Sequence, residues 1–172
     1  MGVLFLSHVS LADYKLSDSS LELSPPEKSF KVKLPAINFR WRHENSEVDD
    51  KKRIYYYTFV SSKKGLTVIA TISEAKCPDI ETCHAAEREI VEYYRNDMLE
   101  NALHLGSVSD IVDSTHGDYL ISRFKFAGYS DLVGATTLKH DHVISFIMVT
   151  DHGNIPDPVI GFLDFVVIEY AP

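Results

Sequence analysis

The chain has 172 residues, of which 45% are hydrophobic and 24% charged, so it can form one globular domain with a buried core, and its composition argues against disorder. Its 25 acidic and 17 basic residues give a formal net charge of −8, which opposes binding to nucleic acid and to anionic lipid headgroups. No apolar run reaches the roughly 18 residues that a transmembrane helix needs, so we expect no membrane span.

Residues 1–27 are interpreted as an N-terminal arm or a signal-like segment. An apolar stretch ends in Ser10, Leu11 and Ala12, the small-residue spacing of a signal-peptide cleavage site, and polar sequence follows. The basic residues that usually precede such a stretch are missing. Three interpretations stay open: an export signal whose true start lies upstream, a first strand, or an expression scar. We expect export to the periplasm or the extracellular space, with the cytoplasm as the alternative location.

Residues 28–172 are assigned to a single domain, whose first half is predicted to be a set of strands. Apolar and polar residues alternate at 30–34 and at 37–41, which indicates strands with one wet face. The stretches at 53–60 and 66–72 are dense in aromatic and β-branched residues. The link between them contains Gly65, so we expect a central antiparallel hairpin.

One long helix is predicted from residue 78 to about 104, because apolar residues recur there every three or four positions. Asp79 is a suitable N-cap, and Gly106 a suitable stop. The predicted apolar stripe consists of Cys83, Ala86, Ile90, Tyr94, Met98 and Ala102.

Beyond the helix, strands are expected at 108–112, 119–126 and 142–150, and 128–138 is expected to be a loop with at most a short edge strand at 135–138. A short C-terminal helix is predicted at 159–165, followed by a final strand. The resulting fold class is α+β: a twisted antiparallel sheet packed by the long helix and the short C-terminal helix in a layered sandwich.

This order of elements resembles that of the PsbP-like superfamily, which includes photosystem II extrinsic proteins, DcrB-type lipoproteins and a Ran-binding nuclear import factor. The resemblance is carried by SFKVKLP at 29–35, INFRW, YYYTFV, the helix beginning near Ala85, HGDYLISRFKF, HVISFIMV and GFLDFVV. It implies an antiparallel sheet between helices and a role in binding or assembly without catalysis.

Four aromatic residues are candidate contacts for a protein partner: Tyr55, Tyr57, Tyr93 and Trp41. Tyrosine and tryptophan offer a large contact area with a polar tip, which suits protein recognition. Burial in the core is the alternative for part of this set, because the alternation of a strand must bury one face.

Histidines provide the best chemical candidate. His140 and His142 lie at strand spacing and His116 lies near a turn, so the three together are a candidate metal site of a hydrolase. Solvated turn histidines are the simpler interpretation. The sequence contains no nucleotide-binding or nucleophile motif, and we expect no cofactor.

Cys77 and Cys83 bracket the segment CPDIETC. In an oxidising compartment they would form a local disulfide, and in the cytosol they would be two thiols. Cys83 also lies on the apolar stripe, so a buried small hydrophobic side chain is a competing interpretation.

The leading functional hypothesis is a non-catalytic protein-binding accessory or adaptor domain of bacterial type, exported and associated with an envelope or secreted assembly. The alternatives are the metal-dependent hydrolase and a carrier of a small apolar ligand. The carrier would need a deep apolar cavity between sheet and helix.

Overall fold

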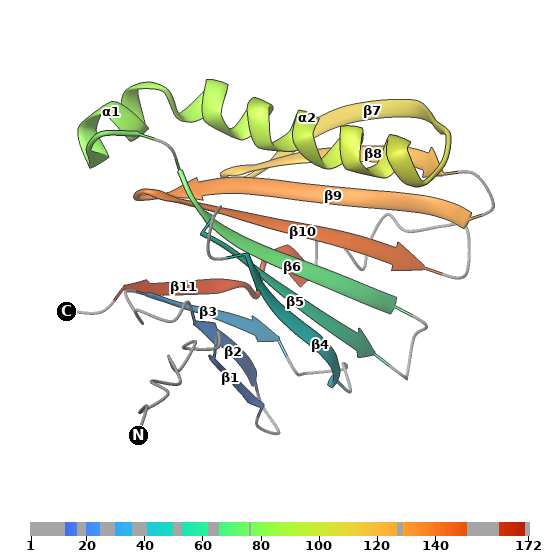
Figure 1. Cartoon of the computed structure of the whole chain (residues 1–172), viewed down its shortest axis with the longest axis horizontal. Coiled ribbons are helices and arrows are strands. Elements are labelled where there is room, and N and C mark those ends of the chain that lie inside the picture. Colours follow the sequence, from blue (N-terminus) through green and yellow to red (C-terminus); the bar gives the residue numbers. More distant parts are fainter. Residues whose placement is uncertain are drawn as a thin grey trace, which may run out of the picture.

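The computed structural model describes residues 13–16, 20–24, 30–35, 41–49, 53–61, 66–75, 77–126, 129–150 and 162–170. In these ranges the strands form two antiparallel sheets (Figure 1). The four-stranded sheet, in spatial order, contains β1 (Asp13–Leu16), β2 (Ser20–Ser24), β3 (Phe30–Pro35) and β11 (Val167–Tyr170). The seven-stranded sheet, in spatial order, contains β4 (Trp41–Asp49), β5 (Ile54–Ser61), β6 (Leu66–Glu74), β10 (His142–Thr150), β9 (Tyr129–Lys139), β8 (Tyr119–Phe126) and β7 (Val108–His116).

The helical segment between β6 and β7 is divided into α1 (Ile80–Ala85) and α2 (Glu87–Leu105). Asp79 caps α1, as expected, because its Oδ1 accepts a hydrogen bond from the backbone N of Thr82 at 2.7 Å. The hydrogen bonds that Thr82 donates to this carboxylate lower the pKa of Asp79. Ala86, with φ −107° and ψ 14°, leaves the helical conformation and ends α1.

The prediction of an α+β layered sandwich was wrong, because the protein is predominantly β. The inner face of the larger sheet is covered by the second sheet, not by helices, and α2 lies along β9 and β8 at one side of the larger sheet (Figure 1). The predicted helix at 159–165 falls partly outside the described residues. In the described part, a single turn joins Phe162 to Phe165.

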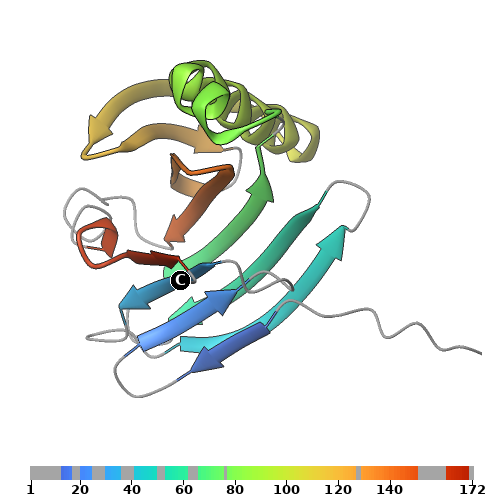
Figure 2. The same ribbon diagram turned by 90° about the vertical axis from the view of Figure 1, so that its left-hand side faces the viewer.

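The main core lies between the two sheets, where side chains from both inner faces meet. The smaller sheet contributes alternate residues of its strands, because a strand points successive side chains to opposite faces. Its fully buried members are Leu21, Leu23, Phe30, Val32 and Leu34. From the larger sheet come Tyr55, Tyr57, Phe59, Val68, Ala70, Ile72, Ile121, Val133, Ala135, Ile144, Phe146 and Met148. Figure 2 shows the smaller sheet lying across this face.

The outward face of the smaller sheet carries charges that pair across the strands. Lys33 lies 2.6 Å from Glu169, and Lys31 lies 3.8 Å from Glu22. The hydrogen bond to Glu169 raises the pKa of Lys33. The lysines of β3 therefore lie beside carboxylates and form a solvated face.

The outer face of the larger sheet allows α2 to approach it closely. On β9, Val133 and Ala135 face the main core, whereas Leu132 packs with Met98 and Leu99 of α2. A Cβ atom added to Gly134 would overlap Cε and Sδ of Met98. Glycine at this position therefore lets the methionine of α2 reach the sheet.

Strand β9 was predicted to be mainly a loop, and it is instead a strand of eleven residues near the centre of the sheet. Its residues from Leu132 to Leu138 are all buried. The small and polar side chains that suggested a loop are needed because helix and core enclose this strand from both faces. β1 and β2, at 13–24, were likewise not predicted.

Candidate functional site

The four aromatic candidates lie in different environments. Tyr55 and Tyr57 are buried between the sheets, and the hydroxyl of Tyr57 donates to the backbone oxygen of Ser24 at 2.6 Å. Tyr93 lies on α2 with 59% of its surface exposed, and its ring meets that of Tyr94 edge to face at 5.5 Å. Trp41 begins β4, and its side chain lies outside the described part. Among the described members of the set, Tyr93 is therefore the one that a partner can reach.

The three candidate metal ligands are not brought together. His142 is buried, its ring packs against Phe30 at 4.5 Å, and its Nδ1 lies 2.7 Å from Oδ1 of Asp141. His140 is exposed in the β9–β10 turn, where its φ of 56° is left-handed. His116 ends β7 and lies 2.6 Å from Asp164.

Within the described residues, no group of three or more histidine, cysteine, aspartate and glutamate side chains is arranged to hold a metal ion. The histidine triad of the predicted hydrolase therefore gains no support from the geometry.

Cys77 and Cys83 form a disulfide, with Cα atoms 5.5 Å apart. Cys83 is fully buried against Val91, Leu138 and Val143, whereas the other residues of α1 are exposed. The short helix is therefore attached to the body of the protein mainly through this one side chain and its covalent bond.

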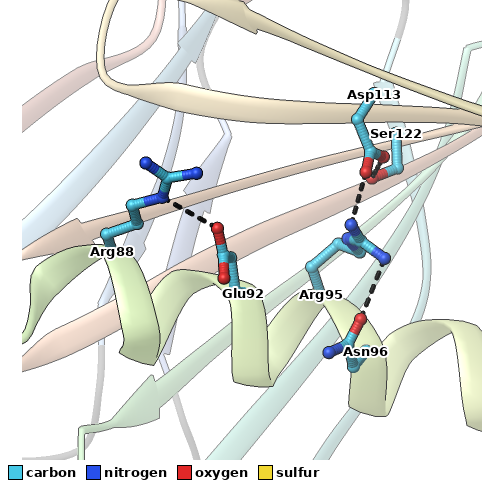
Figure 3. A network of polar contacts seen from close by, with 6 residues as sticks. All are labelled: Arg88, Glu92, Arg95, Asn96, Asp113 and Ser122. Carbon is cyan, nitrogen blue, oxygen red and sulfur yellow. Dashed lines mark hydrogen bonds and ion pairs between the residues drawn. The ribbon is translucent and has the colours of Figure 1, made fainter.

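A polar network fixes α2 to the last two strands of the larger sheet (Figure 3). The guanidinium of Arg95 donates to Asp113 of β7 and, through Nη1, to Oδ1 of Asn96 at 2.9 Å. The other carboxylate oxygen of Asp113 accepts from the hydroxyl of Ser122 on β8 at 2.7 Å. A second pair, between Arg88 and Glu92, is exposed to solvent and has a separation of 2.9 Å. Asp113 therefore joins three elements at one edge of the sheet.

Strand β7 is the end strand of the seven-stranded sheet, and each of its nine residues is exposed or half-exposed. Ile111 exposes 48% of its surface and Val112 exposes 60%. A register shift between Ser109 and Val112, with Asp110 at φ 54°, makes a bulge near the middle. We call this strand with its two exposed apolar residues the β7 edge.

The β7 edge is an available site for pairing with another strand, because an end strand presents N–H and C=O groups that its own sheet does not use. In the described ranges no strand pairs with the outer side of β7. The sequence indicated a strand at 108–112 but not that it ends a sheet. That position depends on the pairing of β8 with β9, which was missed.

Neither of the two helices in the described ranges is both long and apolar enough to cross a membrane. No protein-family model matches the chain, and no curated protein sequence matches it significantly.

Proposed function

We propose that this protein is a non-catalytic binding domain that takes an extended segment of a partner protein as an additional strand beside β7. The observation that carries the proposal is the nine-residue β7 edge, which ends the larger sheet and exposes Ile111 and Val112. In such strand addition the main-chain hydrogen bonds supply affinity and the side chains supply specificity.

The β7 edge is better suited to this role than the other sheet edges. β1 and β11 have four residues each, and Tyr170 of β11 already stacks on His140 at 3.8 Å. β4 has nine residues, but its sequence WRHENSEVD is mostly polar. β7 combines length with apolar side chains.

The β7 edge is also held in place before any partner binds. The Arg95–Asp113 ion pair and the Ser122–Asp113 hydrogen bond tie the strand to α2 and β8 (Figure 3). A preformed edge loses less conformational entropy on binding than a mobile segment would. The partner segment should place apolar side chains next to Ile111 and Val112.

Site-specific photo-crosslinking tests this function. A photoreactive amino acid replaces Val112, and in the control it replaces Lys31, which is exposed on the outward face of the other sheet. We expect a discrete crosslinked protein from position 112 and none from position 31. An excess of this protein without the photoreactive amino acid should compete for the partner and suppress the crosslinked product. An excess of the Ile111→Lys, Val112→Lys double variant should not compete, so the product should persist. Equal products from both positions, or competition by the double variant, would contradict the proposal.

We also propose that the domain works in an oxidising compartment, because the Cys77–Cys83 disulfide persists where thiols are not kept reduced. The test is alkylation of protein isolated from its native source without reductant, with mass spectrometry as the readout. We expect no alkylated cysteine. Two alkylated thiols would place the chain in a reducing compartment. Kinship with the PsbP-like superfamily stays a prediction.

A further inference from the structure

Two histidines that are distant in sequence face each other at the end of the molecule opposite the α2 C-terminus. The ring centroids of His84, on α1, and His140, in the β9–β10 turn, are 6.5 Å apart, and the rings are inclined by 61°. Both residues are exposed. Among the described residues, neither imidazole has a hydrogen-bond or ion-pair partner. Their nitrogens are therefore uncommitted and accessible.

The backbone that carries His84 is held by two features that precede it in the chain. The residue before it in the chain, Cys83, is buried and bonded to Cys77, and Asp79 caps the helix start. His84 therefore projects from a helix whose position is set by a covalent bond.

The backbone that carries His140 is tied to the same region. The N–H of Ala75 donates to the backbone oxygen of Asp141 at 2.6 Å, which joins the turn to the chain just before Cys77. The His140 ring stacks on Tyr170 with centroids 3.8 Å apart. Figure 1 shows α1, the β9–β10 turn and the end of β11 at this same end of the molecule.

We propose that His84 and His140 together bind one divalent transition-metal ion of the Zn²⁺ or Cu²⁺ type. Imidazole nitrogen is a preferred ligand of both ions, at about 2.0–2.1 Å from zinc. Both side chains are exposed, and they must reorient for a nitrogen of each to reach the same ion. With two protein ligands, the other coordination positions are filled by water, so the bound ion stays exchangeable and open to an external ligand.

This site differs from the one that sequence spacing suggested. His140 is common to both, but His142 points into the core and His116 pairs with Asp164. The partner of His140 is His84, which lies 56 positions earlier in the sequence and beside the disulfide. The site does not depend on the proposed strand pairing at β7.

Metal titration of the full chain tests the proposal, with Zn²⁺ followed by calorimetry and Cu²⁺ followed by broadening of backbone NMR signals. We expect binding of one ion, with broadening centred on His84 and His140. Loss of an outer-shell partner typically weakens metal binding about 10- to 100-fold, and loss of a direct ligand should weaken it at least as much. His84→Ala and His140→Ala should each show this loss.

Two control variants separate this pair from general surface binding. His116→Ala removes an imidazole elsewhere, and Glu81→Ala removes an exposed carboxylate from the same helix as His84. Both should bind within about twofold of the original chain. Because His84 and His140 are exposed, the thermal midpoints of their alanine variants should match that of the original chain. Unchanged affinity in either histidine variant, or an equal loss in His116→Ala, would overturn the proposal.

Discussion

The two faces of the seven-stranded sheet are covered in different ways. The inner face meets the smaller sheet through large side chains such as Tyr57, Phe59 and Phe146, all fully buried. Beneath α2 the outer face instead presents Gly134 and buried hydroxyl residues, Ser122 and Thr136. The inner interface is therefore stabilised by the amount of apolar surface removed from water, whereas the outer one depends on how closely a helix can approach.

The largest expected effect is on the inner face. Phe146→Ala removes a fully buried ring that contacts Phe162 edge to face at 5.5 Å, and should lower the free energy of unfolding by about 3–5 kcal/mol. Phe165→Ala makes the same change at a side chain that is 63% exposed, and should alter stability by about 0.5 kcal/mol or less. Urea denaturation measures both. Similar losses in the two variants would show that the inner face does not dominate stability.

A smaller effect is expected on the outer face. Gly134→Val places side-chain atoms where Met98 now lies, and this overpacking should cost about 1–3 kcal/mol of unfolding free energy. Met98→Ala in the same chain should recover part of that loss, because it removes the atoms that clash. A double-mutant cycle by urea denaturation measures the coupling. If the two changes are additive, the close contact between Gly134 and Met98 is not what limits the approach of α2.

These two faces also show why one half of the fold was predictable. The strands at 30–34, 53–60 and 66–72 were expected close to where they occur, because their apolar residues are large and alternate. β9 was missed because Gly134 and its threonines resemble a loop until α2 is placed above them. The smaller sheet determines which tyrosines of the run at 55–57 turn inward, and its strands β1 and β2 were not predicted.

The candidate sites were less predictable than the strands. Their members come together through pairings between distant parts of the chain. The spacing of His140 and His142 was visible in the sequence, but the turn sends one outward and the other into the core. His84 carries no local signal that pairs it with His140. The exposure of Val112 follows from the end position of β7, which no short window reveals.

A still smaller effect is expected from one hydrogen bond of the inner face. Tyr57→Phe removes the hydroxyl that donates to the Ser24 oxygen, and this buried acceptor would then lack that donor, which should cost about 1–2 kcal/mol. Tyr93→Phe, at an exposed tyrosine, should stay within about 0.5 kcal/mol of the original chain. Urea denaturation again gives the values. An equal response of the two variants would mean that the hydroxyl of Tyr57 does not help to join the sheets.

The smallest effect at neutral pH is expected at Tyr119, whose ring packs partly against the inner core. Burial, with a smaller contribution from Asp118, raises its pKa from 10 to about 12. The folded state thus holds the proton more tightly than the unfolded state. The stability that this provides is complete below pH 10 and is lost as the pH rises towards about 12.

Tyr119→Phe should therefore flatten the fall in stability above pH 10. Thermal unfolding at several pH values from 7 to 12 measures this, with Tyr93→Phe as the control variant. A Tyr119→Phe curve parallel to that of the original chain above pH 10 would contradict the assignment of a shifted pKa to this residue.

The pairing of β3 with β11 brings together segments that are synthesised at very different times. Lys33 and Glu169, which are joined by an ion pair, are separated by 136 positions in the chain. The smaller sheet therefore cannot be completed on the ribosome until Tyr170 has emerged. Until then, the side of β3 that pairs with β11 is an unpaired sheet edge. Closing so long a loop is entropically costly, so we expect docking of β11 to be a late event in folding and removal of 167–170 to promote aggregation through β3.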